Sequence, residues 1–354
     1  MATQLDHYRL LGRSGLRVSP LCLGAMTFGV ETGAWGSSEA EAATMLDTYL
    51  ERGGNFIDTA DFYGGMGGSE RLLGKLLGKR RERAIISTKY SLTTRPGDPN
   101  ASGNHRRNMV RSVEDSLRRL GTDWIDLLYL HMWDFRTPVD EILRAFDDLV
   151  RAGKVLYTGL SDVPAWQASR MQAIADLRGW TPFCALQISY SLIERTVERE
   201  MIPMAREMGM GVCPWSPLGG GVLSGKYTRA DLAPPQPGST YDRKTMNAAT
   251  GRLSERNIAI AEVVAQIAAE IGASPAQVAL AWTLANPAVS APVLGARTPA
   301  QLEDNLGALD LTLDESHLQR LDTASAVPAV FPMDVLKSPA EAMMFGNVRV
   351  DERN

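Results

Sequence analysis

The feature that most restricts the fold of this chain is an alternation between short apolar runs and segments with helical periodicity. The alternation occurs eight times along the 354 residues. We expect strands at residues 21–28, 55–60, 84–89, 126–131, 157–161, 185–190, 211–215 and 291–294. Repeated strand-then-helix units are typical of a parallel sheet, and eight of them favour an α/β protein with a closed (β/α)8 TIM barrel. A doubly wound open sheet is the alternative.

Capping signals predict where the helices of these units begin. Either Ser37 or Ser38 caps the first helix, because Glu41 stands three residues after Ser38 and completes a capping box. Ser69 is expected to begin the second helix, and Asn104 to cap the third.

Three segments lie outside the repeated units. Residues 8–20 alternate and turn in the manner of a small N-terminal β-hairpin. A Gly- and Pro-rich excursion spans residues 217–254, and two extra helices are expected after it. No shift in composition marks a linker, so we predict a single domain over residues 1–354, with a long C-terminal tail at 326–354.

Composition argues against several classes of function. The net charge is −4, and the most basic stretch, 105–119, also holds acidic residues, so nucleic acid is not an expected partner. No apolar run approaches the ~20 residues that cross a bilayer, and no signal peptide opens the sequence. Cys22, Cys184 and Cys213 lie in apolar runs, as buried reduced thiols do. We therefore expect a cytoplasmic protein without a membrane partner. The four histidines have no metal-site spacing, so no metal is expected.

Polar side chains stand at the ends of three consecutive strands. Asp58 ends the second strand and Tyr63 follows it in a Gly-rich turn, while Lys89 and His131 end the next two. Because the carboxyl ends of barrel strands meet at one face, the four side chains are expected to lie together. A turn-capping aspartate beside a packed tyrosine explains the first pair equally well on its own. It does not explain the matching positions of Lys89 and His131.

This set suits proton transfer from a phenol. An unperturbed tyrosine titrates near 10, and the ammonium of Lys89 is expected to lower the pKa of Tyr63. Asp58 would hold the lysine charged, and His131 would hydrogen-bond the same region. Tyr63 could then protonate an oxygen that gains negative charge, as in carbonyl reduction. No side chain supplies hydride, so a nicotinamide or a flavin is required.

The cofactor signals are less specific when each is taken singly. No GxGxxG follows a strand, so a Rossmann site is not indicated. Residues 220–226 fit GxxxxGK, but Tyr227 replaces the Ser or Thr of a triphosphatase loop; the backbone N–H groups could still hold a pyrophosphate. Trp215 either stacks on a nicotinamide or caps the core. Arg297 precedes a helix start at Thr298 and either binds phosphate or makes a surface ion pair.

Taken together and in order, these motifs resemble those of the aldo-keto reductases over residues 8–321. The stretch from Asp58 to Glu70 is similar to the family's Asp and Tyr signature, and the runs ending in Lys89 and His131 are similar to its other two motifs. The family's opening and cofactor segments are matched by residues 21–29, 215–218, 225–227, 295–297 and 301–305.

The resemblance implies an oxidoreductase that uses NADP(H), with NAD as the alternative, and interconverts a small-molecule aldehyde or ketone and its alcohol. It implies a catalytic tetrad of Asp58, Tyr63, Lys89 and His131, with Tyr63 as the proton donor. The cofactor residues it implies, together with those at the strand ends, are Met26, Thr27, Asp58, Ser161, Asp162, Gln187, Trp215, Ser216, Pro217, Leu218, Gly219, Gly221, Lys226, Gly295, Ala296, Arg297, Gln301, Asp304 and Asn305.

Within that set the resemblance implies a division of roles. It assigns Ser161, Asp162 and Gln187 to the carboxamide, Trp215 to the nicotinamide ring and the loop after it to the pyrophosphate. It assigns the residues from 297 onward to the adenosine 2′-phosphate end, which favours NADP over NAD. Asp162 departs from the family, since many members carry Asn there and an aspartate cannot donate to the carboxamide oxygen. Asp304 stands where Glu is common.

Substrate choice is expected to depend on loops. Phe28, Trp35, Tyr90 and Trp133 are candidates for the pocket wall, and the apolar tail is either a lid over the barrel mouth or a subunit interface in a homo-oligomer. Two other functions stay open. A cofactor-binding regulatory subunit that resembles potassium-channel β subunits would show little turnover, and a metal-dependent barrel enzyme would lose activity in EDTA.

Overall fold

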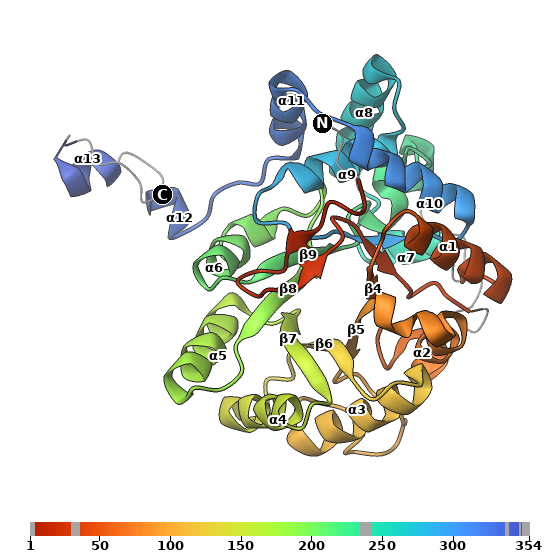
Figure 1. Cartoon of the computed structure of the whole chain (residues 1–354). Helices are drawn as coiled ribbons and strands as arrows, with labels where there is room; N and C mark the ends of the chain where they lie inside the picture. The colour runs from red at the N-terminus through yellow and green to blue at the C-terminus, as the bar shows by residue number, and fades with distance from the viewer. Residues whose placement is uncertain (1–3, 30–35, 234–241, 337–339, 347, 349–354) are drawn as a thin grey trace.

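Eight parallel strands form a nearly closed barrel in the computed structural model, which describes residues 4–29, 36–233, 242–336, 340–346 and 348 (Figure 1). The strands are β3 (Cys22–Gly24), β4 (Phe56–Asp58), β5 (Ile85–Tyr90), β6 (Ile125–Leu130), β7 (Val155–Ser161), β8 (Phe183–Ser189), β9 (Gly211–Trp215) and β10 (Val293–Gly295). They pair in the order β10-β3-β4-β5-β6-β7-β8-β9, and Val212 of β9 bridges Val289 just before β10. This bridge joins the two ends of the sheet, so the barrel expectation is confirmed and the open sheet is wrong.

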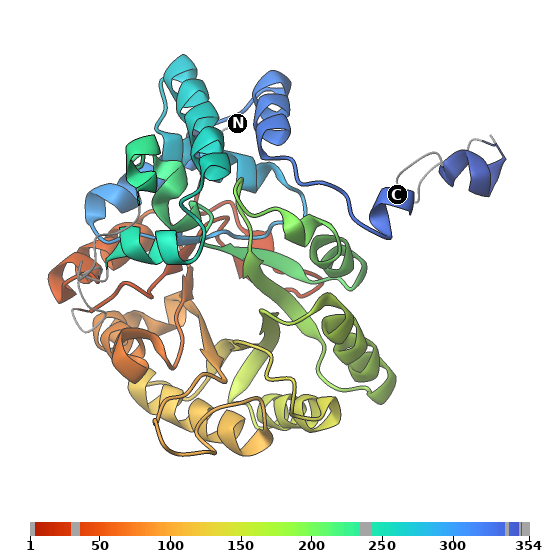
Figure 2. The same cartoon turned by 180° about the vertical axis from the view of Figure 1, so that it is seen from behind.

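Helices run back along the outside of the barrel between successive strands (Figures 1 and 2). These helices are α1 (Glu39–Glu51), α2 (Tyr63–Leu77), α3 (Arg106–Leu120), α4 (Val139–Arg151), α5 (Ala165–Arg178), α6 (Met201–Glu207) and α10 (Pro299–Leu306). In the described part of the expected excursion after β9 there is one α-helix that the sequence analysis missed, α7 (Arg243–Ala249), besides two short 3-10 helices at Gly219–Ser224 and Arg229–Leu232. The two extra helices follow α7 as α8 (Glu255–Ile271) and α9 (Pro275–Ala285), as predicted.

The N-terminal hairpin closes the amino-terminal end of the barrel. Strands β1 (Arg9–Leu10) and β2 (Arg17–Val18) pair antiparallel, as expected. The Arg13 N–H donates to Gly209 O at 2.8 Å and Arg9 Nη1 donates to Val289 O at 3.1 Å, so the hairpin is bonded to residues just before β9 and β10. One apolar cluster joins the hairpin to the barrel interior and includes the three buried free cysteines: Leu11, Val18, Cys22, Phe56, Leu127, Tyr129, Cys184, Ala185, Cys213, Ala291 and Val293. The carboxyl end of the barrel, opposite the hairpin, is not covered by this hairpin.

The helix starts agree with the capping signals in two cases out of three. Ser38 and Glu41 form the expected capping box of α1. In α2, residues 64–67 have left-handed backbone angles, so the regular helix starts beyond them, near Ser69 as predicted. The Asn104 prediction is wrong by one residue: His105 Nδ1 accepts from the Asn108 N–H at 3.2 Å and caps α3. Asn104 instead bonds the loop after β6.

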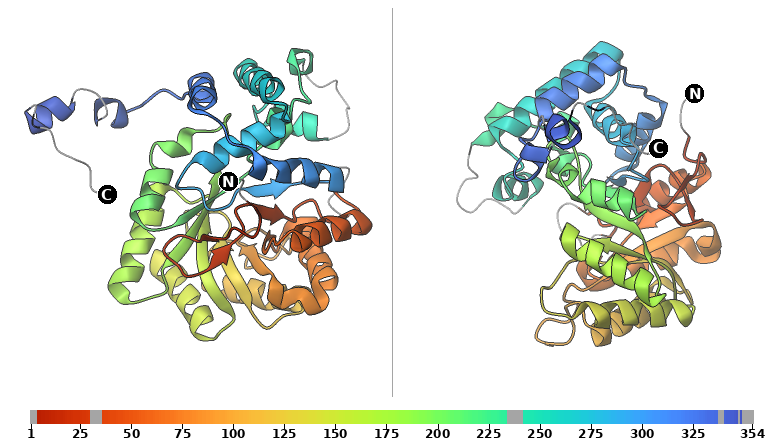
Figure 3. Two further views of the ribbon diagram at one scale, coloured as in Figure 1. Left: turned by 45° about the horizontal axis from the view of Figure 1, so that its top comes forward. Right: turned by 90° about the vertical axis from the view of Figure 1, so that its left-hand side faces the viewer.

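The C-terminal tail leaves the barrel after α11 (Glu315–Ser325). Two short helices, α12 (Met333–Leu336) and α13 (Ala340–Phe345), lie outside the ring of barrel helices in Figures 1 and 2 and in the left panel of Figure 3. Within the described ranges, no single helix is long and apolar enough to cross a bilayer. The helices α8 and α9 together have the length and apolar composition of a membrane span, but a 100° bend separates them.

Candidate active site

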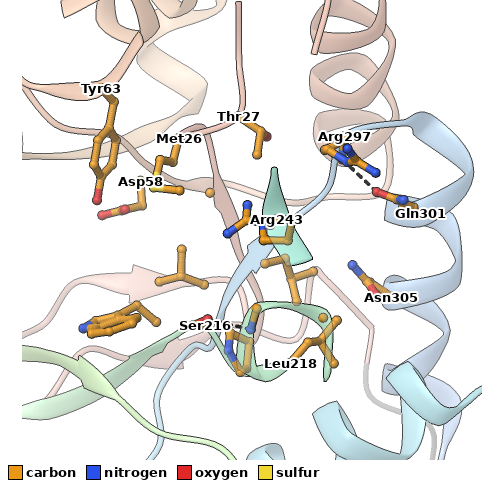
Figure 4. Close-up of a pocket in the computed structure, with 18 of the residues that line it drawn as sticks. Met26, Thr27, Asp58, Tyr63, Ser216, Leu218, Arg243, Arg297, Gln301 and Asn305 are labelled. Carbon is orange, nitrogen blue, oxygen red and sulfur yellow. Dashed lines mark hydrogen bonds between the residues drawn. The ribbon is translucent and has the colours of Figure 1, made fainter. Parts of the chain in front are cut away.

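A cavity of about 660 Å³ opens at the carboxyl end of the strands, opposite the hairpin. Side chains from seven strand ends and from the loop after β9 line it, in agreement with the expected position of the site. Figure 4 shows Tyr63 and Asp58 at one end and Arg297, Gln301 and Asn305 at the other. The cavity is therefore elongated. The residues expected to transfer a proton lie at one end, and the residues expected to bind phosphate lie at the other.

A buried ion pair lies at the first end, where Asp58 lines the cavity and Lys89 lies behind it. Lys89 Nζ lies 2.6 Å from Asp58 Oδ2 and donates to Thr59 O at 2.8 Å. The other carboxylate oxygen, Asp58 Oδ1, accepts from Ser87 Oγ at 2.7 Å and from Gln187 Nε2 at 2.9 Å. Both charged side chains are almost completely buried. A buried charge is tolerated only when it is paired and hydrogen-bonded, and this pair satisfies both conditions.

The strand register explains why the pair forms. Asp58 of β4 stands opposite Ser87 of β5, and Lys89 lies two residues farther along the same face of β5. Alternate residues of a strand share a face, so Ser87 and Lys89 both reach the Asp58 carboxylate. Burial lowers the pKa of Lys89, but the charges and hydrogen bonds of Asp58 and Tyr63 outweigh burial and raise it. The lysine is therefore charged at neutral pH.

Tyr63 lies against this ion pair and against His131. The Lys89 Nζ atom is 4.9 Å from the centre of the Tyr63 ring, and Tyr63 Oη is 3.5 Å from His131 Nε2. Burial raises the pKa of Tyr63, and the charge of Lys89 reduces but does not cancel that effect. Lys89 thus lowers this pKa as expected, but burial, which the sequence analysis did not consider, leaves it above its usual value. The phenol is protonated at neutral pH.

His131 is neutral in this setting. Burial lowers its pKa to about 3, and the nearby charge of Lys89 acts in the same direction. Its ring lies edge-to-face with that of Tyr63, with centroids 5.6 Å apart. Nδ1 is buried and has no hydrogen-bond partner among the described residues. A neutral imidazole can hydrogen-bond the same oxygen that Tyr63 reaches without adding a charge to the site.

Next to the tetrad, Asp162 and Trp215 form a second bonded pair. Trp215 Nε1 donates to Asp162 Oδ1 at 3.1 Å, and both side chains line the cavity together with Ser161 and Gln187. Burial raises the pKa of Asp162, while the indole hydrogen bond opposes the rise. The side-chain amide of Gln187 donates one hydrogen bond to Asp58 Oδ1.

The far end of the cavity gathers positive charge. Lys226, Arg243 and Arg297 all line it. Burial lowers the pKa values of Lys226 and Arg243, and the charge of Arg297 lowers both further. Like charges held close together create a site for an anion. The Ser216 hydroxyl accepts from the Gly220 N–H at 3.0 Å and shapes the loop between the two ends.

The backbone at this end of the barrel is strained at alternate strands. The residues that follow β5, β7 and β9 are Ser91, Asp162 and Ser216, with φ of 115°, 47° and 55°. Left-handed backbone is unfavourable for residues with a Cβ atom. Each of these residues redirects the chain at the point where a strand reaches the cavity.

Most of the residues predicted for the cofactor line this cavity, but two do not. Gly219 and Ala296 lie behind the wall, where the Ala296 carbonyl accepts from Thr27 Oγ1 at 2.6 Å. The sequence analysis missed several residues that do line it, among them Phe62, Leu92, Gly220, Ser224, Arg243, Met246 and Arg252. Phe62 directly precedes Tyr63 and could have been found from that position. Arg243 follows Asp242, which caps α7, a helix that was not predicted.

The predicted substrate wall is wrong for the three candidates that the structure describes. Phe28 and Tyr90 are fully buried in the core, and the Tyr90 hydroxyl donates to Asn104 O at 3.1 Å. Trp133 packs in the same cluster as Tyr90 and does not line the cavity. Trp35 lies outside the described residues. Phe62, Leu92 and Trp215 supply the apolar wall near the tetrad instead.

No group of three or more His, Cys, Asp or Glu side chains is placed to hold a metal ion in the part of the chain that the structure describes. The charged groups that line the cavity are the carboxylates of Asp58, Asp162 and Asp304 and a cluster of cations.

The fold and this cavity define the class of barrel enzymes whose site is built from the carboxyl ends of eight parallel strands. Comparison with known proteins narrows the class. The model of the Aldo/keto reductase family matches residues 20–326, and the chain belongs to this family. It is accordingly an oxidoreductase that acts on carbonyl or alcohol groups.

Individual relatives agree with this assignment. A norsolorinic acid reductase of Aspergillus flavus is 39% identical over 344 residues, which are 94% of this chain and 85% of the relative. An uncharacterized oxidoreductase, YrpG, of Bacillus subtilis is 40% identical over 326 residues, or 89% and 94% of the two chains. An aryl-alcohol dehydrogenase of Pestalotiopsis microspora is 36% identical over 337 residues, or 93% and 84%.

Proposed function

We propose that this protein is an NADPH-dependent reductase of aldehydes or ketones, with Tyr63 as the proton donor. The observation that carries the proposal is the position of a protonated Tyr63 phenol, between a charged Lys89 and a neutral His131, on the wall of an elongated cavity. A carbonyl oxygen at this place would face a proton donor and the positive charge of Lys89.

The residues of the cavity fit a nicotinamide dinucleotide. Trp215 offers an aromatic face near the tetrad, and the cations at the far end suit phosphate groups. When bound, the cofactor would supply the hydride that no side chain can provide. The protein's own part is then to orient the carbonyl group, to exclude water and to deliver the Tyr63 proton to the oxygen.

Lys89 and Asp58 would support that proton transfer by electrostatics. As the phenol loses its proton, the positive Lys89 stabilises the phenolate, and Asp58 keeps the lysine in place and charged. His131 would contribute a neutral hydrogen bond to the substrate oxygen. The same side chains in reverse would accept the proton of an alcohol.

A preference for NADP over NAD rests on the cluster of Lys226, Arg243 and Arg297. The additional 2′-phosphate of NADP carries the charge that such a cluster binds. We expect Arg297→Ala to raise KM for NADPH by about 10-fold, the scale of one hydrogen bond to a charged group, and to leave KM for NADH nearly unchanged. Equal changes for both cofactors would place the 2′-phosphate elsewhere.

The substrate class is proposed to be aromatic carbonyl compounds. Phe62, Leu92 and Trp215 form an apolar wall next to Tyr63, and flat apolar surfaces favour aromatic ligands. The names of two relatives, a norsolorinic acid reductase and an aryl-alcohol dehydrogenase, agree with this class.

The experiment is NADPH consumption with a panel of aromatic and aliphatic carbonyl compounds, by the wild-type protein and by Tyr63→Phe. We expect turnover by the wild type and a loss of roughly 100-fold or more in kcat for the variant, because general acid catalysis contributes on that scale. The Kd for NADPH should change little. A variant with wild-type turnover would refute the proton-donor role. A wild type that binds NADPH but turns over no carbonyl would favour the regulatory-subunit alternative.

A further inference from the structure

Asp162 brings a carboxylate to the cavity next to the tetrad. It follows β7, its φ is 47°, and its Oδ1 accepts from Trp215 Nε1 at 3.1 Å. Neither feature requires a negative charge. An asparagine adopts left-handed backbone as readily as an aspartate does, and its amide oxygen accepts from an indole N–H equally well. The charge is therefore the property that an aspartate adds at this position.

Among the described residues, Asp162 is the carboxylate at this end of the cavity that no cation pairs with; it accepts a hydrogen bond from the Trp215 indole. Asp58 is compensated at 2.6 Å by Lys89, and Tyr63 and His131 are neutral at pH 7. The third carboxylate on the cavity wall, Asp304, accepts from Ser274 Oγ and Gln277 Nε2 on the far side, among the residues that follow Arg297. Asp162 is also near enough to Tyr63 for its charge to raise the pKa of the phenol.

We propose that Asp162 is a specificity-determining residue that favours the oxidised, cationic form of the bound nicotinamide over the reduced, neutral form. The proposal rests on the nicotinamide cofactor proposed above. In the proposed reaction, the Tyr63 proton would pass to the carbonyl oxygen as the bound nicotinamide supplied a hydride to the carbonyl carbon. The ring thereby changes from neutral to singly positive.

The position of the ring follows from the chemistry of that step. The carbonyl oxygen must reach the Tyr63 hydroxyl, and the hydride donor must approach the carbonyl carbon to about 3–3.5 Å. Tyr63, Trp215 and Asp162, which line the cavity close to one another, would therefore hold the ring between them. In a site of low polarity, an anion there stabilises the positive charge that develops on the ring. Asp162 thus promotes reduction and slows the release of the oxidised cofactor.

The test is a pair of equilibrium titrations, with NADP⁺ and with NADPH, of the wild type and of Asp162→Asn. The variant keeps the size and the indole acceptor but removes the charge. We expect the ratio Kd(NADP⁺)/Kd(NADPH) to rise about 10-fold, which is ~1.4 kcal/mol. Asp123→Asn, which removes the same charge from an exposed turn, is the matched control and should leave the ratio unchanged.

The titrations test the role of Asp162 and the cofactor assignment separately. If both forms bind and the ratio is the same in wild type and Asp162→Asn, Asp162 does not discriminate between them and this inference is overturned. If the wild type binds neither nucleotide, the cofactor assignment itself fails. Asp162→Ser provides a second variant in case the Asp162→Asn protein does not fold. Serine is suitable because Ser216 adopts a similar left-handed backbone, with a φ of 55°. This variant should show the same rise in the ratio.

Discussion

At the scale of single residues, Tyr63 and His131 stay neutral beside the charged pair of Lys89 and Asp58. Lys89 and Asp58 are charged, while the pKa values of Tyr63 and His131 are displaced so that neither group is charged at neutral pH. A phenol that is protonated in the resting site can act as an acid, and its proton leaves only when an oxygen nearby gains negative charge.

The low pKa of His131 has a consequence for stability. An unfolded histidine titrates near 6.5, and in the folded protein the value is about 3. Between these two pH values the unfolded state binds a proton that the native state does not. Stability therefore rises with pH across this window: the contribution is fully present above pH 6.5 and is lost as the pH falls toward 3.

We expect this loss to be on the order of 3 kcal/mol at pH 4. His131→Gln has no titrating ring, so the acid limb of its stability profile should be flatter than that of the wild type. Urea unfolding at a series of pH values from 4 to 8 measures both curves. Parallel curves for the two proteins would show that His131 does not titrate as the structure implies.

The sequence predicted that Asp58, Tyr63, Lys89 and His131 lie together, but it did not predict which apolar side chains line the cavity near them. Strand alternation helps to explain both results. A polar residue at the end of a strand is evident in the sequence, and parallel strands bring such ends together. Tyr90, however, follows Lys89 directly in β5, so the two side chains point to opposite faces. Since Lys89 points into the barrel, Tyr90 must point outward to the helices. The pKa of Tyr63 was not predictable, because it depends on burial in the folded cavity.

At the scale of elements, Asn104 connects the loops that follow β5 and β6. Its Nδ2 donates to Met132 O at 2.8 Å, and its Oδ1 accepts from the Asp134 N–H at 2.9 Å. The side chain is fully buried. Because residue 132 comes directly after His131, this pair of bonds holds the loop that continues from a member of the tetrad.

We expect Asn104→Ala to lower the free energy of unfolding by about 2 kcal/mol, since it removes the two hydrogen bonds made by a fully buried side chain. KM for the carbonyl substrate should rise as well, because the loop after His131 loses its support. Urea unfolding and steady-state kinetics measure the two effects. Asn100→Ala, at an exposed position of the same segment, is the control. An Asn104→Ala protein as stable as this control would contradict the role.

Element positions were more predictable than element ends. The α1 capping box and the bounds of β9 agree with the sequence, because local chemistry determines them. The start of α3 was wrong by one residue because an imidazole served as the cap, while the nearby asparagine bonded a distant loop. Such a choice depends on tertiary contacts. The helix α7 was missed within a segment whose Gly and Pro content favoured a loop.

At the scale of the whole molecule, the C-terminal tail projects away from the barrel (Figure 1). Arg195 and Arg199 fix its base through Asp322 and Pro328 O, and beyond these bonds the chain leaves the barrel. Exposed apolar side chains follow, at Val330, Phe331, Val335, Leu336, Met343, Met344 and Phe345. None of these residues lines the cavity. That the chain is one domain with this tail, and that it is cytoplasmic, remain predictions.

We expect removal of residues 330–354 to change the state of association and not the stability of the barrel. Large exposed apolar side chains on a projecting segment favour contact with another molecule. The truncated chain should have a lower molar mass in light scattering than the full chain, with the same urea midpoint. Equal masses would show that the tail is not an interface, and a lower midpoint would show that it packs on its own barrel.

The left-handed residues after β5, β7 and β9 bear on how this enzyme could be improved for use at high temperature. Each carries an unfavourable backbone worth ~1–2 kcal/mol, and glycine would relieve it. At two of the three positions, Asp162 and Ser216, the side chain that glycine would remove also faces the cavity. Selection for heat resistance and selection for turnover should therefore act in opposite directions at these two sites. At Ser91 the side chain does not line the cavity, but glycine there would remove the hydrogen bonds between the Ser91 hydroxyl and the Met132 backbone, so relief of backbone strain would be offset.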